Sequence, residues 1–448
     1  MMAAACYLAL SLIILGSTLC ALVPRVFGRL LAPWAAFTGM MMVFFIPQSV
    51  ALGLLVTLFA LHAGAFGYLA GQVGLAIQGA CWIALGAHWY RMVQAYPLLD
   101  GQPVGDDAQP FGPPPSPAEG GQGVRPVWGM ARWWSMVTYR IPAMQRVRVR
   151  RNITYRTVGG LQLKLDVYRA VRDPGAHQDP GADPPQPAIL YIHGGAWCMG
   201  TRQQSRFMLY ELAEAGWTVF SISYRLAPRF PLPSAIEDCK AALAWIREHA
   251  AEFGARPDHI VVMGGSAGGH LAALLAVTPN QPQFQPGFEH ADTRVQGAVV
   301  LYGVTDLTGA FEDAPDWGMA WLLERVVFRR RYREDPTPFQ LASPLVHLER
   351  LGADVPPILL VHGMEDRMVS IAQSRRFADR LRRAGARVVH LLEVPHVPHA
   401  FEIFPSPMQR RTVRVIEAFL ARLGEKESAQ TWPEGESLPQ GAQQPPMR

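Results

Sequence analysis

The feature that most constrains this chain is a run of 61 residues, from Leu30 to Tyr90, that contains no Lys, Arg, Asp or Glu. A helix needs about 20 apolar residues to cross a bilayer. The run therefore has room for two spans, which we place at 38–61 and 66–89. An apolar stretch over 6–23 comes before the run and predicts a first span. The N-terminal part is thus expected to hold about three membrane-spanning helices.

Other interpretations of this region stay open. Two or four spans would also fit, and the first apolar stretch could be a signal peptide that is followed by an anchor. A signal peptide is disfavoured because the chain begins MMAAACY, with no positive charge, and a second hydrophobic run follows at once. We therefore assign 1–92 to an all-α transmembrane region of about three helices.

Three arginines near the predicted spans indicate an orientation. Arg25 and Arg29 lie between the first and second spans, and Arg91 follows the third. Cytoplasmic flanks of membrane helices are enriched in Lys and Arg. Three spans would therefore put the N-terminus outside, and both basic flanks in the cytoplasm together with the domain that follows. The expected protein is a multi-pass membrane protein.

Composition divides the rest of the chain into four segments. Residues 101–126 contain seven Pro and six Gly, so that 93–127 is expected to be a linker. A basic and aromatic segment follows at 128–151, and a folded domain extends over 152–424. The polar tail, 425–448, is expected to be disordered.

The net charge of +5 would by itself suggest a nucleic-acid partner. Seven arginines and no acidic residue lie within 125–151, however, and Trp128, Trp133 and Trp134 are interleaved with them. Basic and aromatic side chains together suit a lipid headgroup layer, although a solvated collar packed on the next domain fits equally well. Much of the positive charge therefore lies beside the predicted membrane, and no nucleic acid is needed to explain it.

The domain over 152–424 alternates strand and helix patterns. A pair of alternating segments about Gly159 and Gly160 predicts an antiparallel hairpin. Helical patterns such as 234–253 then separate short apolar runs. These runs predict strands at 188–193, 218–223, 259–264, 297–303, 357–363 and 387–394. A hairpin followed by strand–helix units implies an α/β fold, in which helices cover both faces of a mostly parallel sheet.

The strongest local signal is Ser266 within GGSAGG, residues 264–269. This segment directly follows the predicted strand HIVVM and directly precedes the helical pattern HLAALLAV. A serine on such a tight turn has strained backbone geometry and an exposed hydroxyl, and the flanking glycines let strand and helix approach each other. A phosphate-binding loop is the alternative, but the segment lacks the Lys-Ser/Thr ending and the glycine spacing of such loops. The turn therefore predicts a nucleophilic serine.

Two glycines follow the predicted strand that ends at His193. In the segment HGGAW, 193–197, they leave the amides of Gly194 and Gly195 unobstructed. Acyl transfer builds negative charge on a carbonyl oxygen, which N–H groups held in place must stabilise. Together with the amide of Ala267, these groups would complete an oxyanion hole. His193 itself is expected to anchor the loop.

A serine nucleophile needs a base, and the base needs an orienting acid. Two acids, Glu365 and Asp366, follow one predicted strand, and two histidines, His396 and His399, follow the next. The order serine, acid, histidine is that of α/β-hydrolases, and open α/β sheets bind ligands at these strand ends. The residues alone leave the choice within each pair open.

The chain resembles an α/β-hydrolase of the hormone-sensitive-lipase or carboxylesterase-like group over roughly 152–423. Arg229 is a departure, because many relatives carry Glu at that position, and it leaves the expected chemistry intact. The resemblance rests on the segments HGGAW (193–197), SYRLAPRFPLPSAIEDC (223–239), GGSAGGH (264–270), HGMEDRMV (362–369) and PHAF (398–401).

The resemblance implies the α/β-hydrolase fold and selects the acting residues. The family pattern HGxxDxxV selects Asp366 over Glu365, and the pattern H-[AG]-F selects His399 over His396. The implied catalytic residues are Ser266, Asp366 and His399, and the implied oxyanion hole is formed by Gly194, Gly195 and Ala267.

The expected function is that of a membrane-anchored serine hydrolase, which cleaves lipid-like esters or esters with short or medium acyl chains. Kynurenine formamidase and prenylcysteine methylesterase resemble the same pattern and are alternative activities. A catalytically silent receptor or adhesion module is the non-enzyme alternative, since a fold alone does not fix a function. It is disfavoured because the serine, the acid, the histidine and the glycine loop are all present. The expected partners are an apolar or lipid-like ester and membrane lipids.

Three further expectations concern the surroundings of the triad. The long segment 305–351 carries several Trp, Leu, Val and Phe residues and is expected to be a cap over an apolar acyl pocket. The spans are expected to hold the enzyme at the bilayer and to have almost nothing to do with catalysis. The triad mechanism implies no metal or organic cofactor. The five cysteines are also too few and too scattered for a zinc site or a disulfide scaffold.

Overall fold

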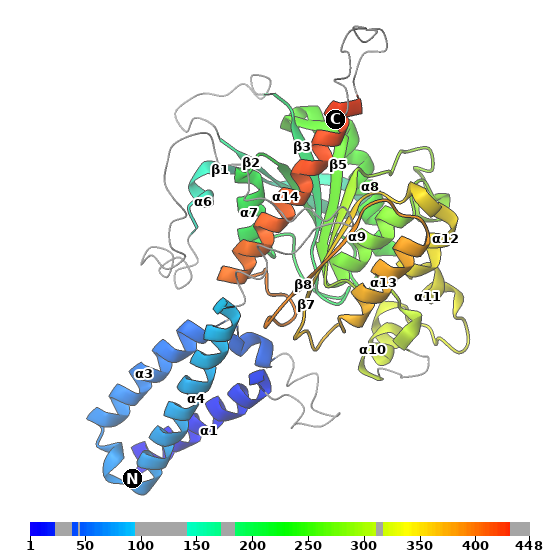
Figure 1. Ribbon diagram of the computed structural model, residues 1–448. Coiled ribbons are helices and arrows are strands. Elements are labelled where there is room, and N and C mark those ends of the chain that lie inside the picture. The colour runs from blue at the N-terminus through cyan, green and yellow to red at the C-terminus, as the bar shows by residue number, and fades with distance from the viewer. Residues whose placement is uncertain (23–37, 44, 95–140, 172–183, 311–316, 431–448) are drawn as a thin grey trace, which may run out of the picture.

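The computed structural model describes residues 1–22, 38–43, 45–94, 141–171, 184–310 and 317–430. An N-terminal helical region is followed by an α/β domain, and the two lie side by side (Figure 1). Residues 95–140, which hold most of the predicted linker and about half of the predicted basic segment, lie outside the described part.

Three spans are expected in the helical region, and its described part holds three long apolar helices. They are α1 (Met2–Leu22), α3 (Ile46–His62) and α4 (Leu69–Gln94). Residues 38–43 are also helical, and a short 3₁₀ turn, Ala65–Gly67, connects α3 to α4. By length and composition α1 and α4 can each cross a bilayer, and α3 is a shorter apolar helix of 17 residues.

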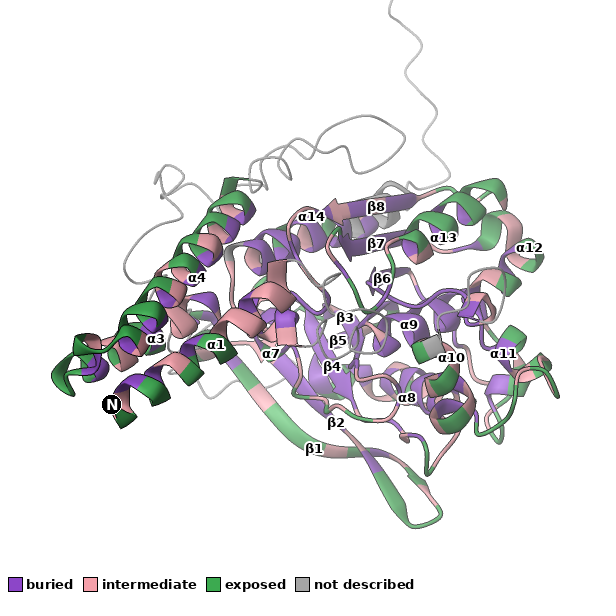
Figure 2. Ribbon diagram, turned by 90° about the horizontal axis from the view of Figure 1, so that it is seen from below, coloured by how far each residue is buried: buried purple, intermediate pink, exposed green. Residues whose placement is uncertain are grey.

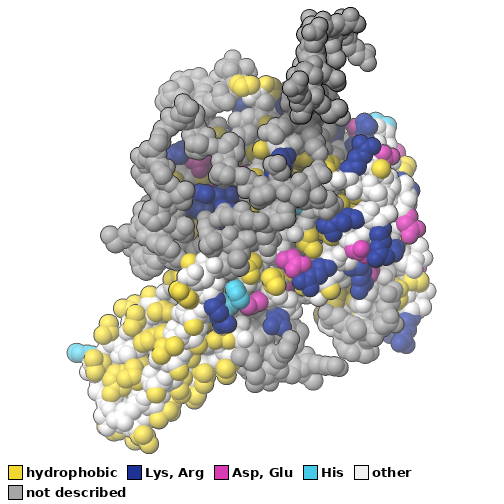
Figure 3. All heavy atoms as spheres, in the orientation of Figure 1, with side chains coloured by type: hydrophobic (Ala, Val, Ile, Leu, Met, Phe, Trp, Pro, Cys, Tyr) yellow, Lys and Arg dark blue, Asp and Glu magenta, His cyan; other side chains and the backbone are white. Residues whose placement is uncertain are grey.

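The helices pack through small and polar residues. Tyr7, Ser11 and Thr18 are buried on α1, and the hydroxyls of Tyr7 and Thr57 lie 2.8 Å apart across the α1–α3 interface. A Cβ added at Gly74 of α4 would come within 2.9 Å of the Tyr7 ring. A few large apolar side chains, such as Ile46 and Leu85, are also buried, but many others face outward, so that the bundle has an apolar surface (Figures 2 and 3).

An eight-stranded sheet forms the centre of the α/β domain, in the order β1-β2-β4-β3-β5-β6-β7-β8. The pairs β1–β2 and β2–β4 are antiparallel, and all the other pairs are parallel. The hairpin and the mostly parallel sheet are as predicted. The strands are β1 (Val147–Val158), β2 (Leu161–Ala170), β3 (Gln186–Ile192), β4 (Thr218–Ile222), β5 (Ala255–Gly265), β6 (Gly297–Leu301), β7 (Ile358–Gly363) and β8 (Val389–Val394).

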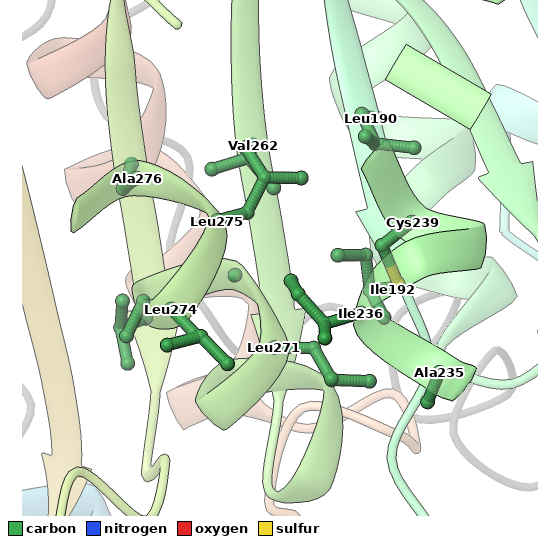
Figure 4. Close-up of a cluster of buried hydrophobic side chains, with 14 of the residues drawn as sticks. Leu190, Ile192, Ala235, Ile236, Cys239, Val262, Leu271, Leu274, Leu275 and Ala276 are labelled. Carbon is green, nitrogen blue, oxygen red and sulfur yellow. The ribbon is translucent and has the colours of Figure 1, made fainter. Parts of the chain in front are cut away.

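Helices cover both faces of this sheet because its central strands are apolar on both faces. In β3, Leu190 and Ile192 pack toward α8 and α9 (Figure 4). Ile189 and Tyr191 pack toward α7 and α14 on the other face. The helices are α6 (Ala143–Arg146), α7 (Arg206–Glu214), α8 (Ser234–His249), α9 (Ala267–Val277), α10 (Trp317–Leu322), α11 (Thr337–Leu341), α12 (Leu348–Leu351), α13 (Ala372–Arg383) and α14 (Pro407–Gln430).

Both ends of the α/β domain extend beyond the expected bounds, 152–424. The first strand begins at Val147, five residues before the expected start of the domain. The last helix ends at Gln430, within the segment expected to be a disordered tail. Residues 431–448 lie outside the described part of the chain.

The helical region contacts the α/β domain through an apolar interface. Met40 and Met92 are buried in the same hydrophobic cluster as Val397 and Phe401. The rings of Phe45 and Phe404 also lie 5.0 Å apart. The helices therefore pack against the loop and turn that follow β8.

Candidate active site

Ser266 occupies the turn between β5 and α9. Its backbone has φ 56° and ψ −121°, and residues other than glycine rarely adopt a positive φ. A Cβ at Gly264 would lie 2.3 Å from the carbonyl oxygen of Gly268, and one at Gly268 would lie 2.1 Å from that of Ile192. These close approaches explain why glycines surround the serine.

His399 and Asp366 converge on this serine from the loops after β8 and β7. The Nε2 atom of His399 lies 2.9 Å from the Ser266 hydroxyl oxygen. Its Nδ1 atom lies 2.7 Å from a carboxylate oxygen of Asp366. The imidazole therefore connects the serine to the carboxylate, which is the arrangement that lets a histidine accept the proton of a serine.

Asp366 is held in its ionised form. Its Oδ1 atom accepts hydrogen bonds from the amides of Met368 and Val369, both at 2.9 Å. Burial alone would raise the pKa of Asp366, but the charge of His399 and hydrogen bonds from His362 and His399 outweigh burial and hold that pKa well below its usual range. The carboxylate is thus available to orient His399 at neutral pH.

Glu365 and His396, the alternatives to Asp366 and His399, contact each other. The Nδ1 atom of His396 lies 3.0 Å from a carboxylate oxygen of Glu365. The structure therefore brings Asp366 and His399 to Ser266, whereas His396 and Glu365 contact each other.

The glycine loop after β3 lies directly beside the serine. A Cβ at Gly194 would be 3.2 Å from the Cβ of Ser266. Gly195 has φ 120°, and a Cβ there would meet the carbonyl oxygen of Met199 at 2.2 Å, so the loop requires glycine. Within the described part of the chain, the amides of Gly194, Gly195 and Ala267 donate no hydrogen bond. They remain available to an oxyanion.

His193 fixes the start of this loop. Its ring stacks on Tyr224 with the centroids 4.4 Å apart, and its Nδ1–H donates to the carbonyl oxygen of Gly194 at 2.8 Å. The Tyr224 hydroxyl donates to the carbonyl oxygen of His193 at 2.9 Å. Burial lowers the pKa of His193 to about 4, so the ring is neutral at pH 7. These contacts are those of a loop anchor.

A cavity of about 170 Å³ adjoins the triad where the two regions meet. On the domain side it is lined by Glu365, Arg367, Met368, Pro398 and His399. On the helical side it is lined by residues 20–22 of α1, by Gly39, Met40 and Val43, and by His88 and Arg91 of α4.

This cavity bears on two sequence-based expectations, the cap over 305–351 and the role of the helices. None of its lining residues comes from the described part of 305–351, the expected cap. In that segment, Val327 and Phe328 are instead buried in the domain core. The helices were also expected to have almost nothing to do with catalysis, yet they form one wall of a cavity beside His399. The sequence of the uncharged run does not predict this contact between the helices and the domain, because hydrophobicity does not indicate which end of a helix packs against the domain.

Potential metal ligands do not cluster in the described part of the chain: no group of three His, Cys, Asp or Glu side chains is suitably placed for a metal ion.

Known proteins resemble the α/β domain in both sequence and structure. The BD-FAE family profile matches residues 177–381. The probable carboxylic ester hydrolase LipM of Mycobacterium tuberculosis is 43% identical over 238 residues, which are 53% of this chain and 54% of LipM. The ethyl acetate hydrolase of Pseudomonas putida is 30% identical over 279 residues, which are 61% of this chain and 82% of that enzyme.

A solved structure gives the same result for the fold. The butyrate-bound esterase 2 of Thermogutta terrifontis superposes with a TM-score of 0.51 and 27% sequence identity, over 63% of this chain and 96% of that one. The chain spans about half the length of LipM and most of the length of the other two proteins.

Proposed function

Because the chain belongs to the carboxylic ester hydrolases of the hormone-sensitive-lipase and carboxylesterase-like group, with the α/β-hydrolase fold, we propose that it hydrolyses carboxylic esters while its N-terminal helices hold it in a membrane. The observation that carries the proposal is the connected set Ser266–His399–Asp366, with contacts of 2.9 and 2.7 Å. Each of these side chains lies just after the carboxyl end of a different strand, namely β5, β8 and β7.

The first half of the reaction forms an acyl-enzyme. The Ser266 oxygen attacks the ester carbonyl while Nε2 of His399 accepts the hydroxyl proton. The charge that develops on the carbonyl oxygen is stabilised by the amides of Gly194, Gly195 and Ala267. His399 then gives its proton to the departing alcohol, and Asp366 stabilises the imidazolium while it exists.

The second half releases the acid. Water takes the place of the alcohol, and His399 accepts a proton from this water as it attacks the acyl-enzyme. His399 then returns the proton to Ser266, so that the free carboxylic acid leaves and the starting site is restored. Every proton in this cycle passes through a single nitrogen atom, Nε2 of His399.

The membrane part of the proposal rests on how the helical region buries its side chains. Helices in lipid associate through small and polar residues, because lipid tails are as apolar as Leu and give apolar side chains no reason to cluster. Here Ser11 and Gln78 are buried, while Leu55 and Phe59 are exposed. This distribution supports a bundle of helices whose solvent is lipid, with the α/β domain at the membrane surface.

The alternatives make different use of the same residues. A formamidase or a prenylcysteine methylesterase would use the same triad on another substrate. A silent receptor or adhesion module would need no contact between the serine, the histidine and the carboxylate, whereas these three side chains are connected here at hydrogen-bonding distances. This connection favours an enzyme over the silent module.

The nucleophile is tested with Ser266→Ala in the full-length protein. This variant should lose both ester hydrolysis and covalent labelling by a fluorophosphonate, because that side chain alone forms the acyl-enzyme. The thermal unfolding of the variant should match that of the wild type. Labelling that persists in the variant would show that another residue is the nucleophile.

Two histidines of one loop provide a matched control. His399→Gln should lower kcat/KM by on the order of 10⁴-fold or more, because loss of one triad member removes most of the benefit of the whole triad. His396→Gln should keep most of the activity, since its ring contacts Glu365 rather than the serine. The reverse ranking would contradict the assignment of the base.

A further inference from the structure

The cavity at the junction of the two regions lies beside the group that protonates the leaving alcohol. Its lining includes His399, whose Nε2 atom faces Ser266, and it includes no residue of the glycine loop 193–197. In acyl transfer the histidine delivers its proton to the leaving group, whereas the carbonyl oxygen faces the oxyanion amides. The position of the cavity is therefore that of the alcohol portion of the ester and not that of its carbonyl oxygen.

The helical region supplies the apolar wall of this cavity. Leu22, Met40 and Val43 line it, and both Met40 and Val43 are buried. Gly39 allows this wall to form, because a Cβ there would lie 2.4 Å from the carbonyl oxygen of Cys20 at the end of α1. Without the helices, the cavity would lose its apolar wall. The site of the leaving group is thus complete only in the full chain.

Charged side chains lie at the edge of the same cavity. Arg91 of α4 and Arg367 of the loop after β7 are both exposed there, and neither forms an ion pair with another residue in the described part of the chain. The one acid of the lining, Glu365, lies against His396. Figure 3 shows basic, acidic and histidine side chains gathered where the apolar bundle meets the domain. The cavity therefore combines an apolar wall with a cationic edge.

We propose that this cavity binds the alcohol portion of a membrane-resident ester, and that the helical region is part of the substrate site as well as an anchor. The alcohol carries an apolar chain, which lies against Met40 and Val43, and a neutral or anionic polar end, which faces Arg91 and Arg367. Such a substrate reaches Ser266 from the bilayer along the helices. This inference rests on the proposed ester hydrolysis.

Two isomeric esters test the proposal in the full-length protein reconstituted in phosphatidylcholine vesicles. Dodecyl acetate has its long chain on the alcohol and ethyl dodecanoate has it on the acid, so that the two partition alike into lipid. Val43→Trp fills the cavity and should lower kcat/KM for dodecyl acetate at least tenfold more than for ethyl dodecanoate. Ile83→Trp is the control, because Ile83 is 76% exposed on the outer face of α4. It should leave both rates unchanged.

A second variant fills the same cavity from the domain side. Met368 lines the cavity from the loop after β7 and is 43% exposed, so Met368→Trp adds bulk where the fold has room for it. It should reproduce the selective loss on dodecyl acetate. The proposal would be overturned if both tryptophan variants slowed the two isomers equally, or slowed neither, while Ser266 was still labelled by a fluorophosphonate. Failure of the wild-type protein to be labelled and to hydrolyse either isomer would instead contradict the proposed function.

Discussion

In the α/β domain the largest fully buried side chains include Tyr168, Phe220 and Leu165. The helical region also buries a few large apolar side chains, such as Leu85, but together with polar ones such as Ser11 and Gln78. The exposed side chains differ more, because Leu55 and Phe59 of α3 face outward. The two parts of the chain thus differ most in what they expose, because large apolar side chains cover much of the outer face of the helical region. In water this second arrangement would leave large apolar side chains unburied, but in lipid it costs nothing.

Two apolar helices without charged residues show that hydrophobicity alone does not distinguish the regions. Helix α9, with the sequence AGGHLAALLAV, is as free of charge as α1, yet every one of its residues is buried against the sheet. In α1 only Ala4, Tyr7, Ser11 and Thr18 are buried. An apolar helix can therefore belong to a protein core or face lipid. The two kinds differ in how much of the helix the rest of the protein buries.

The largest effect should come from a charge placed on the outer face of the helical region. Leu55 lies near the middle of α3 and is 65% exposed, whereas Leu161 of the hairpin is 36% exposed. If lipid surrounds α3, Leu55→Arg should cost about 3–4 kcal/mol of insertion free energy, because the cost of Arg adds to the lost contribution of Leu. Leu161→Arg should change the stability by no more than about 0.5 kcal/mol, as is usual for a surface residue in water. Carbonate extraction and thermal unfolding measure the two effects.

The comparison would fail if the more exposed leucine proved the more tolerant. Full membrane retention and unchanged activity of Leu55→Arg would mean that the outer face of α3 contacts water or another protein. A loss of membrane retention confined to Leu55→Arg would sharpen the contrast between the two regions.

Acid should affect the α/β domain before the helical region. Burial lowers the pKa of both His193 and His270 to about 4, below the ordinary value of 6.5. Between those pH values the unfolded chain binds more protons than the folded one, so the free energy of unfolding falls as the pH falls. At pH 5 this amounts to about 2 kcal/mol for each histidine. The urea midpoint of tryptophan fluorescence, measured at pH 7.5 and 5, checks the loss.

A variant of one buried histidine separates its contribution. His270 accepts a hydrogen bond from Trp197 and donates one to the carbonyl oxygen of Ala342, at 3.0 and 2.7 Å. His270→Gln should be less stable than the wild type at pH 7.5 but should lose less stability on going to pH 5. His290→Gln, in an exposed loop, should keep the full acid sensitivity. If His270→Gln lost as much stability at pH 5 as the wild type, protonation of His270 would not contribute to the acid sensitivity.

The sequence predicted the parts of this molecule whose signals are local. The strand before Ser266, the glycines around it and the helix after it lie within one short segment, because the tight turn itself demands those residues. The choice of Asp366 over Glu365 depended on the family pattern, since both acids follow the same strand. The structure separates them by their hydrogen bonds, which depend on the exact course of the loop.

The cavity wall could not have been predicted from local patterns. Val43 and Arg91 are separated from Met368 by more than 250 residues, and nothing near them in the sequence indicates that they meet. The cap over 305–351 stays a prediction, because Phe328 and Phe339 of that segment pack into the core whereas Trp321 is 61% exposed. Contacts between distant segments depend on packing that composition does not encode.

The smallest effect should come from single methyl groups inside the helical bundle. Gly74 and Gly79 both lie within α4, so replacing either with alanine should favour the helix by roughly 0.5–1 kcal/mol. At Gly79 the added Cβ meets nothing within 4 Å, whereas at Gly74 it comes within 2.9 Å of the Tyr7 ring and 3.3 Å of the backbone of Leu8. Gly74→Ala should therefore lose this gain and destabilise the bundle by about 1 kcal/mol or more, because overpacking forces neighbours to move.

Unfolding of the full-length protein in mixed detergent micelles, followed by circular dichroism, measures the difference in stability between Gly74→Ala and Gly79→Ala. Equal stability of the two variants would mean that α1 and α4 do not pack closely through Tyr7 and Gly74, so that the close approach of these two helices would not contribute to the stability of the helical region.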